Sequence, residues 1–477
     1  MTTTDDALEL DAIGQAELVR RKEVSAAELV EAAIARIERV NPKVNAVVIE
    51  TFERAREAGR APFEGPFSGV PFLLKDIACE EAGVPLRSAS RFGDDAVPAA
   101  DNELVRRYRA AGLVFLGHTN APELGIGPTT EPQLYGPARN PWDSQRSTGG
   151  SSGGAAAAVA TGMVAAAHGN DAGGSIRIPA ACCGLFGMKP TRARNPVAPN
   201  FGDIIVGIAQ DHVLTRSVRD SAALLDVTAG PTLGDPYWAP PVARPFAEEA
   251  RTEPRRLRIA FSTASPIGTP IDPDCVRVTV ETAKLLEALG HIVEEAAPDV
   301  DGEAFWRAFT TVIAAGVGWA LAGLERRLGR EATPDDLEPF VWGFTRRARE
   351  QTAPQFLLAL QDMQRHSREM AGFFVEHDLW LTPALGSPPL PLGTFKLQQG
   401  GDAMALRRQM NVFTPFTWMS NASGQPAMSV PSGWTEAGLP LATHFVGRFG
   451  DEATLFRIAA QIEAARPWTG RKPPIHA

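Results

Sequence analysis

The chain is poor in cysteine and tyrosine for its length, with four cysteines and three tyrosines in 477 residues. The cysteines show no CxxC spacing, and Cys182 and Cys183 are adjacent. This pattern disfavours a zinc site and a disulfide framework, and it fits a reducing cytoplasm. The first residues, MTTTDDALELDA, are acidic and lack the basic and apolar regions of a secretory signal. We therefore expect a cytoplasmic protein without a metal.

An excess of positive charge is also missing, since the formal net charge is −9 and no stripe of Lys and Arg occurs. A surface that binds nucleic acid through its phosphates needs clustered basic residues, so we expect no nucleic-acid partner. Only residues 308–324, AFTTVIAAGVGWALAGL, form an uncharged run near the length that crosses a bilayer. Its Gly, Ala and Thr make it weakly apolar, which favours a buried helix beside a pocket over a membrane segment or a partner-docking helix.

Helix and strand patterns alternate along the chain, whose hydrophobic content of 44% suits a folded globular protein. The stretch SAAELVEAAIARIERV begins with a capping box, Ser25 with Glu28, and DNELVRRYRAAGLVFLGHTN reads as an Asp101 cap, a helix, a stop at Gly112 and a strand. The same helix-to-strand order returns at residues 274–296. This alternation predicts an α/β fold with a largely parallel or mixed sheet.

The stretch STGGSSGGAAAAVATG, residues 147–162, places two serines between glycine pairs. A flexible linker is disfavoured because an alanine-rich helix pattern follows at once, and a phosphate-binding loop would need a lysine that is missing here. No cofactor is therefore expected. Two Gly-x-Ser-x-Gly matches, centred on Ser151 and Ser152, suit a nucleophile elbow, which requires a preceding strand. We predict residues 136–148, GPARNPWDSQRST, to be a loop, so the elbow is disfavoured.

A second serine in a glycine setting is Ser175, in HGNDAGGSIRIPA. The small residues between the two serine motifs allow the chain to turn back and bring the motifs together. A serine nucleophile needs a positioned base, and the eight histidines lie in scattered, unremarkable contexts. Lys75 ends the apolar stretch VPFLL, where burial would lower the pKa of its amine until it could accept a proton. A buried ion pair between Lys75 and Asp76 is the alternative.

The segment from residue 149 to 191, GGSSGGAAAAVATGMVAAAHGNDAGGSIRIPAACCGLFGMKPT, resembles the signature of the amidase signature family. The likeness extends upstream to GVPFLLKD and ARNPWD, and downstream to NASGQPAMSVPSGW and GLPLATHFVG. It implies an α/β amidase signature fold, in which helices cover both faces of a central, mixed, twisted sheet. It also implies one domain over residues 1–477, with N-terminal helices to about residue 60, the signature core at about 61–220 and a helical cover at about 300–378.

Carried over residue by residue, the resemblance makes Ser175 the acyl-forming nucleophile and Lys75 the base. Ser151 would bridge the two on an unusual cis peptide bond between Gly150 and Ser151. The main-chain N–H groups of residues 172–175, that is Ala172, Gly173, Gly174 and the nucleophile itself, would form the oxyanion hole.

The resemblance assigns supporting roles to five further residues. Gly125 and Ile126, in ELGIGPTTEP, match the place where the family's substrate channel meets the proton relay. Ser152, Asp171 and Arg177 would hold the catalytic residues in place without touching the substrate. For Asp171 and Arg177 we favour an ion pair that holds the loop over direct substrate binding.

The details of GNDAGGSIRIP resemble stand-alone bacterial amidases, including those that open the cyclic dimer of 6-aminohexanoate and those that act on anilides or carbamates. The implied activity is hydrolysis of small, fairly apolar amides, whether linear, cyclic or aryl, with carbamates and esters as further substrates. The alternative is the glutaminase subunit of a tRNA-dependent amidotransferase, in which a glutamine commonly follows the SIR motif. Ile178 stands there in this chain, which disfavours that alternative. The intact Lys, Ser, Ser set disfavours a non-enzymatic role, and both a monomer and a homodimer remain open.

Overall fold

A single large sheet forms the centre of the computed structural model, which describes residues 4–93, 97–397, 399 and 401–477. Within these residues, eleven strands pair in the order β1-β3-β2-β6-β8-β7-β12-β13-β11-β9-β10, and β4 pairs separately with β5. The strands are β1 Val47–Glu50, β2 Pro71–Lys75, β3 Val114–Thr119, β4 Arg139–Asn140, β5 Asp143–Ser147, β6 Ala166–Asp171, β7 Phe186–Lys189, β8 Gln210–Thr215, β9 Arg258–Phe261, β10 Ile292–Glu295, β11 Leu379–Pro383, β12 Ala427–Trp434 and β13 Pro440–Gly447.

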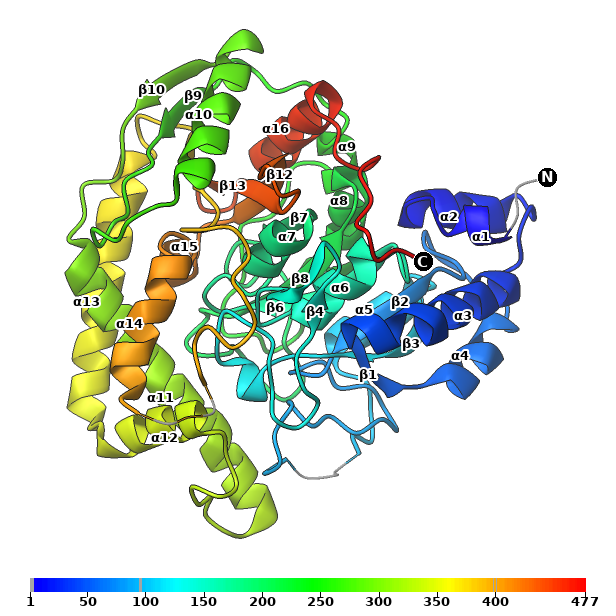
Figure 1. The fold of residues 1–477 in the computed structure, drawn as a ribbon, viewed down its shortest axis with the longest axis horizontal. Helices are drawn as coiled ribbons and strands as arrows, with labels where there is room; N and C mark the ends of the chain where they lie inside the picture. The colour runs from blue at the N-terminus through cyan, green and yellow to red at the C-terminus, as the bar shows by residue number, and fades with distance from the viewer. Residues whose placement is uncertain (1–3, 94–96, 398, 400) are drawn as a thin grey trace.

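The helices lie around this sheet, with α11 to α14 gathered at one side of the molecule and α1 to α4 at the other (Figure 1). They are α1 Thr4–Ala7, α2 Ala12–Arg20, α3 Ala26–Val44, α4 Phe52–Gly59, α5 Glu103–Ala110, α6 Gly153–Ala160, α7 Arg177–Cys183, α8 Val218–Thr228, α9 Phe246–Glu249, α10 Pro273–Ala288, α11 Gly302–Leu328, α12 Pro339–Glu350, α13 Ala353–Phe373, α14 Ala403–Phe413, α15 Thr417–Ser423 and α16 Glu452–Ala465, with a short 3₁₀ turn at Glu123–Gly125.

The sheet is mixed, as the sequence predicts. Strand β2 runs parallel to β3 and β6, and β9 runs parallel to β10 and β11, while the remaining pairs of the sheet are antiparallel. The expectation of a largely parallel sheet is therefore met only toward its two ends. The α/β class and the covering of both faces by helices are confirmed.

Alternating side chains of the central strands enter two different hydrophobic cores, because successive residues of a strand point to opposite faces. In β11, Trp380 belongs to the core that contains α3, α6, α7 and α11, whereas Leu379 and Leu381 belong to the core that contains α8, α9 and α16. Buried on both faces, the strand reads as a short apolar run rather than as an alternating pattern.

The N-terminal caps of two helices can be compared with the sequence pattern. The capping box of α3 forms as predicted, with Ser25 accepting from the Glu28 N–H and Glu28 reaching back to the Ser25 N–H. The cap of α5 is a correction: Asn102, not Asp101, accepts from the Val105 N–H. The Asp101 carboxylate instead accepts from the Ala82 N–H, 19 residues away, and from Arg109 of α5 itself. Either residue type can cap a helix, and these other partners of Asp101 leave the cap to Asn102.

The segment before GGSSGG corrects a second expectation, because residues 136–148 are not simply a loop. They contain the hairpin of β4 and β5. The hairpin lies outside the central sheet and is anchored to a distant segment, where the Ser147 N–H donates to the Leu390 carbonyl at 2.8 Å. It therefore cannot present a serine at the top of the sheet as a nucleophile elbow does.

The uncharged run at residues 308–324 lies inside α11, a helix long and apolar enough to cross a membrane by length and composition. Half of its most apolar window is buried within the protein, where α11 packs against α12 and α13. These three helices lie within the range, about 300–378, for which the resemblance implies a helical cover. We infer from the shared sheet, whose strands come from residues 47–447, that the chain folds as one domain.

Gly154 holds α6 against the sheet at a point where no side chain fits. A Cβ at this position would meet the Asn120 backbone nitrogen, the Asn120 oxygen at 2.7 Å and the Ala46 oxygen at 2.6 Å. We expect Gly154→Ala to lower the free energy of unfolding by about 2 to 3 kcal/mol, because rigid backbone must move. Denaturant unfolding monitored by circular dichroism measures this change.

The matched control is Gly372→Ala in α13, an exposed helical glycine with open space around it. There the substitution should raise stability by about 0.5 to 1 kcal/mol, since alanine favours the helix. Equal effects of the two substitutions would contradict the close approach at Gly154.

Candidate active site

Lys75 is the last residue of β2, a strand that is buried along its whole length. Its Nζ lies 2.7 Å from Ser151 Oγ and 2.5 Å from Asn170 Oδ1. Asn170 belongs to β6, which runs parallel to β2, so the two side chains meet at the same edge of the sheet. The amine is thus held in a fixed position between a hydroxyl and an amide oxygen.

The amine of Lys75 is poised to lose its proton. Burial lowers its pKa to about 7, although the negative charges of Asp211 and Asp171 oppose this effect. Asp76 does not pair with it: the Asp76 carboxylate accepts instead from the N–H groups of Arg87 and Ala89. Lys75 therefore matches the expectation of a base better than that of a structural ion pair.

The two serine motifs lie together, joined through their backbones. The peptide bond between Gly150 and Ser151 is cis, as expected. The Ser152 N–H donates to the Ser175 carbonyl at 3.2 Å. Ser151 is buried, whereas Ser175 is partly exposed. Among the described residues no hydrogen bond joins the two hydroxyl groups, so direct proton transfer between the two serines requires one side chain to move.

The loop that carries Ser175 is fastened by Asp171 and Arg177, both fully buried. Two hydrogen bonds of 2.9 Å join the guanidinium to the two carboxylate oxygens. Burial alone would raise the pKa of Asp171, but the charge and hydrogen bonds of Arg177 hold that pKa well below its usual range. The remaining donors of Arg177 reach the Thr417 carbonyl, Ser420 Oγ, Asn421 Oδ1 and His444 Nε2. The pair has the loop-holding geometry that we favour from the sequence.

The same carboxylate reaches into the expected oxyanion loop. Asp171 Oδ1 accepts from the Gly174 N–H at 2.7 Å, which occupies that donor. The N–H groups of Ala172, Gly173 and Ser175 make no hydrogen bond within the described part of the chain. Gly174 has φ +128°, and a Cβ there would collide with Thr417 Oγ1. Gly174 thus shapes the turn, and its neighbours keep their N–H groups free for a ligand.

The two residues expected beside the channel differ in their contacts. A Cβ on Gly125 would lie 3.6 Å from Ser151 Oγ, so this glycine borders the serine directly. Ile126 is half-buried and packs against the main hydrophobic core. Ser152, expected behind the site, is buried and donates its hydroxyl to the Asn170 carbonyl at 3.3 Å.

Helices α11 and α15 reach the other side of the Ser175 loop. A Cβ on Gly173 would lie 3.7 Å from Phe309 Cζ, and the Thr417 hydroxyl donates to the Gly173 carbonyl at 2.7 Å. Phe309 is fully buried, so it packs behind the loop.

Sequence reasoning missed two side chains that support the site. Asn170 accepts from Lys75, and Asn421 donates to the backbone and the carboxylate of Asp171, each at 2.8 Å. The position of Asn170 at the end of a strand parallel to β2 is a usable signal. Nothing close in sequence to Asn421 links it to Asp171, 250 residues away.

The buried histidines around the site have other partners, as their scattered contexts suggest. His168 Nε2 lies 3.1 Å from Asp211, and His212 Nε2 lies 2.9 Å from Ser221 Oγ. Burial lowers the pKa of His212 to about 3. Among the described residues, no group of three or more His, Cys, Asp or Glu side chains is placed to hold a metal ion.

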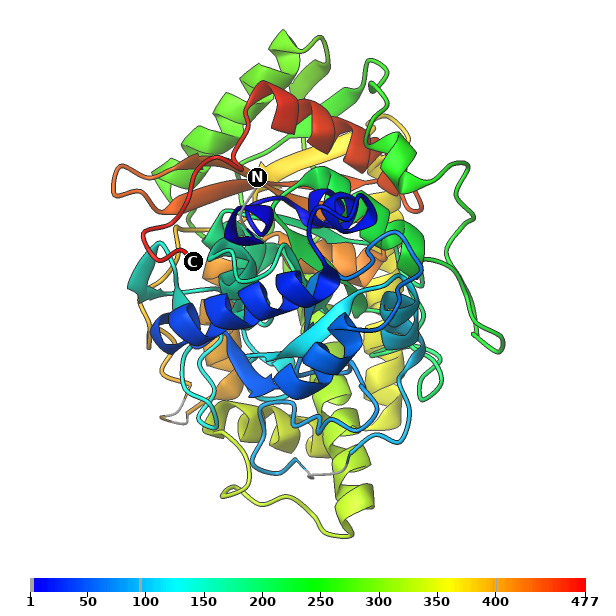
Figure 2. The same cartoon turned by 90° about the vertical axis from the view of Figure 1, so that its right-hand side faces the viewer.

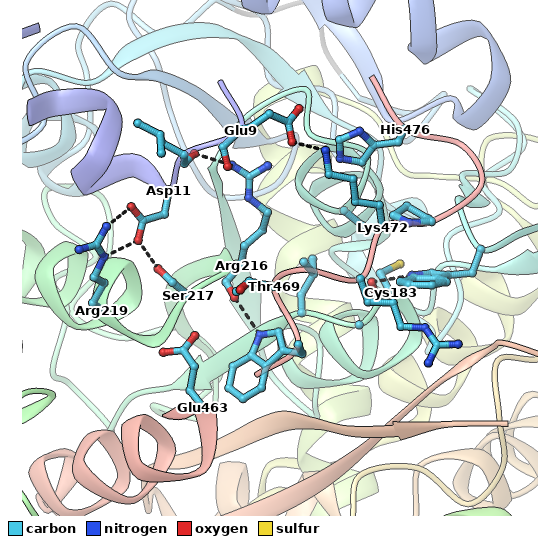
Figure 3. Close-up of a pocket in the computed structure, with 18 residues that line it drawn as sticks. Glu9, Asp11, Cys183, Arg216, Ser217, Arg219, Glu463, Thr469, Lys472 and His476 are labelled. Carbon is cyan, nitrogen blue, oxygen red and sulfur yellow. Dashed lines mark hydrogen bonds and ion pairs between the residues drawn. The ribbon is translucent and has the colours of Figure 1, made fainter. Parts of the chain in front are cut away.

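A cavity of about 390 Å³ lies elsewhere, between the segments near the two chain ends (Figure 3). Helices α1 and α2 and the C-terminal segment lie on the same side of the molecule (Figure 2). The charged groups that line this cavity are paired with the protein, as in Arg219 with Asp11 and Lys472 with Glu9. None of the expected catalytic residues lines it.

Comparison with known proteins places this geometry in a family. The family model named Amidase matches residues 28–456. The chain belongs to the amidase family. It is 39% identical over 480 residues to the 6-aminohexanoate-cyclic-dimer hydrolase of Paenarthrobacter ureafaciens, covering 98% of this chain and 96% of that protein.

Solved structures of amidase signature enzymes share the fold. A 6-aminohexanoate cyclic dimer hydrolase complexed with substrate superposes with a TM-score of 0.93 at 37% identity, over 98% of this chain and all of that one. A bacterial aryl acylamidase of the amidase signature family superposes with a TM-score of 0.87 at 27% identity, over 97% of each chain. The protein is therefore an amidase, a hydrolase acting on carbon–nitrogen bonds.

In this amidase, Asp171→Asn should damage both stability and activity. It leaves the buried Arg177 guanidinium without its counter-charge, so we expect a loss of about 3 to 5 kcal/mol in the free energy of unfolding. The value of kcat/KM should fall by about 100-fold, since the loop carrying Ser175 loses its position. Urea unfolding and steady-state kinetics on the same preparation measure the two effects.

A surface ion pair serves as the control. Arg106→Met removes the pair between Arg106 and Glu103, in which the arginine side chain is 64% exposed. This change should leave the free energy of unfolding almost unchanged, because solvent screens an exposed ion pair. An equal cost for both variants would mean that the buried pair is no stronger than a surface one.

Proposed function

We propose that this amidase is a serine hydrolase of small, fairly apolar amides, using Lys75, Ser151 and Ser175 through an acyl-enzyme. The observation that carries the proposal is the 2.7 Å contact between Lys75 Nζ and Ser151 Oγ in a buried setting where the amine loses its proton near neutral pH. A neutral amine beside a serine hydroxyl is a base in hydrogen-bond reach of its proton.

In the proposed reaction, Ser175 Oγ attacks the amide carbon and passes its proton to Ser151, whose own proton moves to Lys75. The tetrahedral oxyanion is bound by the free N–H groups of Ala172, Gly173 and Ser175. The carbon–nitrogen bond breaks as the relay returns a proton to the leaving amine. Water then attacks the acyl-enzyme by the reverse proton path and releases the acid.

The substrate class follows from the walls of the site. The fully buried Phe309 of α11 packs behind Gly173 and gives the Ser175 loop an apolar backing, which suits linear, cyclic or aryl amides with hydrocarbon bodies. Relatives that act on a cyclic amide or on acyl amides of aryl amines support this range. Carbamates, as in urethanase activity, and esters pass through the same kind of tetrahedral intermediate and belong to the proposed range.

The glutaminase subunit of an amidotransferase is not favoured, since Ile178 offers no polar group for a glutamine side chain. The partner that we propose is a small-molecule amide or carbamate, without nucleic acid or membrane, in the cytoplasm. The packing of α11 against α12 and α13 and the negative net charge support this assignment. A monomer and a homodimer both fit.

A panel of substrates tests the activity. We expect the wild-type protein to hydrolyse an anilide, a linear alkyl amide, a cyclic diamide and a phenyl carbamate, and Ser175→Ala to lose at least about 10³-fold in kcat, as for loss of an attacking serine. Product release measured by chromatography reports all four substrates. Hydrolysis that survives in Ser175→Ala would remove the assigned nucleophile.

Covalent labelling separates the two serines in the same experiment. A sulfonyl fluoride should modify Ser175, as read by peptide mass spectrometry. Modification of Ser151 or Ser152 instead would show that the nucleophile is wrongly assigned to Ser175. Release of ammonia from glutamine that needs a co-purifying partner would favour the amidotransferase.

The pKa of Lys75 predicts the pH dependence. Only the neutral amine can accept a proton, so kcat/KM should rise about tenfold per pH unit below pH 7 and level off above it. Lys75→Met should lose this rising limb together with most of the turnover. Initial rates between about pH 5 and pH 9 measure the profile.

Lys472→Met is the matched control, because this lysine is half-exposed and bound to Glu9 far from the site. Its profile should match that of the wild type. A wild-type profile that stays flat through pH 7 would rule out Lys75 as the base.

A further inference from the structure

Two adjacent arginines of α14, Arg407 and Arg408, differ in the partners of their guanidinium groups. Arg408 is exposed, pairs with Glu303 and lies over the ring of Trp306 at 5.6 Å. Arg407 has neither a carboxylate partner nor a hydrogen bond among the described residues, and its Nε is buried without an acceptor. A half-buried guanidinium with unused donors is uncommon, because desolvation costs free energy that a partner normally offsets.

The guanidinium of Arg407 lies beside the loop that carries Ser175. A Cβ on Gly173 would be 3.9 Å from Arg407 Nη2 and 3.7 Å from Phe309 Cζ. Gly173 and Arg407 are both partly exposed, so both border space that a ligand can enter. Helix α14 lies next to α15 along one side of the molecule (Figure 1). Arg407 thus lies next to Gly173, one of the proposed oxyanion donors.

The charge of Arg407 persists at neutral pH. Burial lowers its pKa only to about 10, which leaves the side chain protonated. The planar fork of the guanidinium matches the two oxygens of a carboxylate and neutralises it. A neutral carbonyl would accept from one N–H of Arg407 and would not neutralise the positive charge of the guanidinium.

We propose that Arg407 binds a carboxylate on the substrate, a few bonds from the scissile carbonyl. The preferred substrates are then apolar amides with one acidic end, which the partly exposed Arg407 holds. This inference rests on the proposed function, because it takes Gly173 as part of the acyl-binding loop.

Matched pairs of substrates test it. Glutaryl p-nitroanilide carries a terminal carboxylate, and its terminal carboxamide analogue is neutral and of similar size. A second pair, butyryl 4-aminobenzoate and butyryl 4-aminobenzamide, puts the acid on the amine side. We expect the wild type to prefer the acid in at least one pair. Arg407→Met should lower kcat/KM for that acid by about 10- to 100-fold, mainly through KM, and change the neutral partner by less than about twofold.

Two further variants separate binding from structure. Arg408→Met should leave both members of each pair unchanged, since Arg408 pairs with Glu303 outside the site. Arg407→Lys keeps the charge and should recover part of the preference for the acid. Free glutarate should inhibit hydrolysis of the neutral anilide competitively, with an inhibition constant raised about tenfold or more in Arg407→Met.

The outcomes are distinct. Equal losses on acid and neutral substrates in Arg407→Met, or no preference for the acid in either wild-type pair, would overturn the role of Arg407. Ser175-dependent hydrolysis of the neutral anilides would still uphold the proposed function in that case. Wild-type protein that cleaves none of the four substrates would count against the proposed function itself.

Discussion

The buried pair of Asp171 and Arg177 is the interaction on which the arrangement of the site depends. One carboxylate at the end of β6 binds the guanidinium, the Gly174 N–H and the Ile176 N–H, and so sets the path of the loop through Ser175. The guanidinium in turn binds groups of α15 and β13. A loop that would otherwise be mobile is held by charge-assisted hydrogen bonds from both directions.

Three cations around this loop differ in the partners that offset their desolvation. Arg177 keeps its charge because a carboxylate and several oxygens surround it. Lys75 contacts only neutral oxygens, so burial lowers its pKa, which is why we propose it as the base. The half-buried Arg407 stays protonated at neutral pH and has no hydrogen-bond partner among the described residues, which is why we propose it as a carboxylate-binding group.

Features that depend on near neighbours in the chain could be predicted from the sequence. The capping box of Ser25, the strand that buries Lys75 and the cis bond before Ser151 all follow from local pattern or from the resemblance of a continuous motif. Features that depend on distant partners could not. The hairpin before GGSSGG is anchored to Leu390, and Asn421 of α15 donates to Asp171 from 250 residues away. Side-chain competition of this kind leaves no periodic signal in the chain.

The reacting groups and the walls of the site come from different parts of the chain. Lys75, Ser151 and Ser175 belong to β2, to the turn before α6 and to the turn before α7, whereas Phe309 and Arg407 belong to α11 and α14, in the group of helices at one side of the sheet (Figure 1). Substitutions in α11 and α14 can therefore accumulate without disturbing the proton path. With this division, related amidases can differ in substrate specificity while they keep the same reaction chemistry.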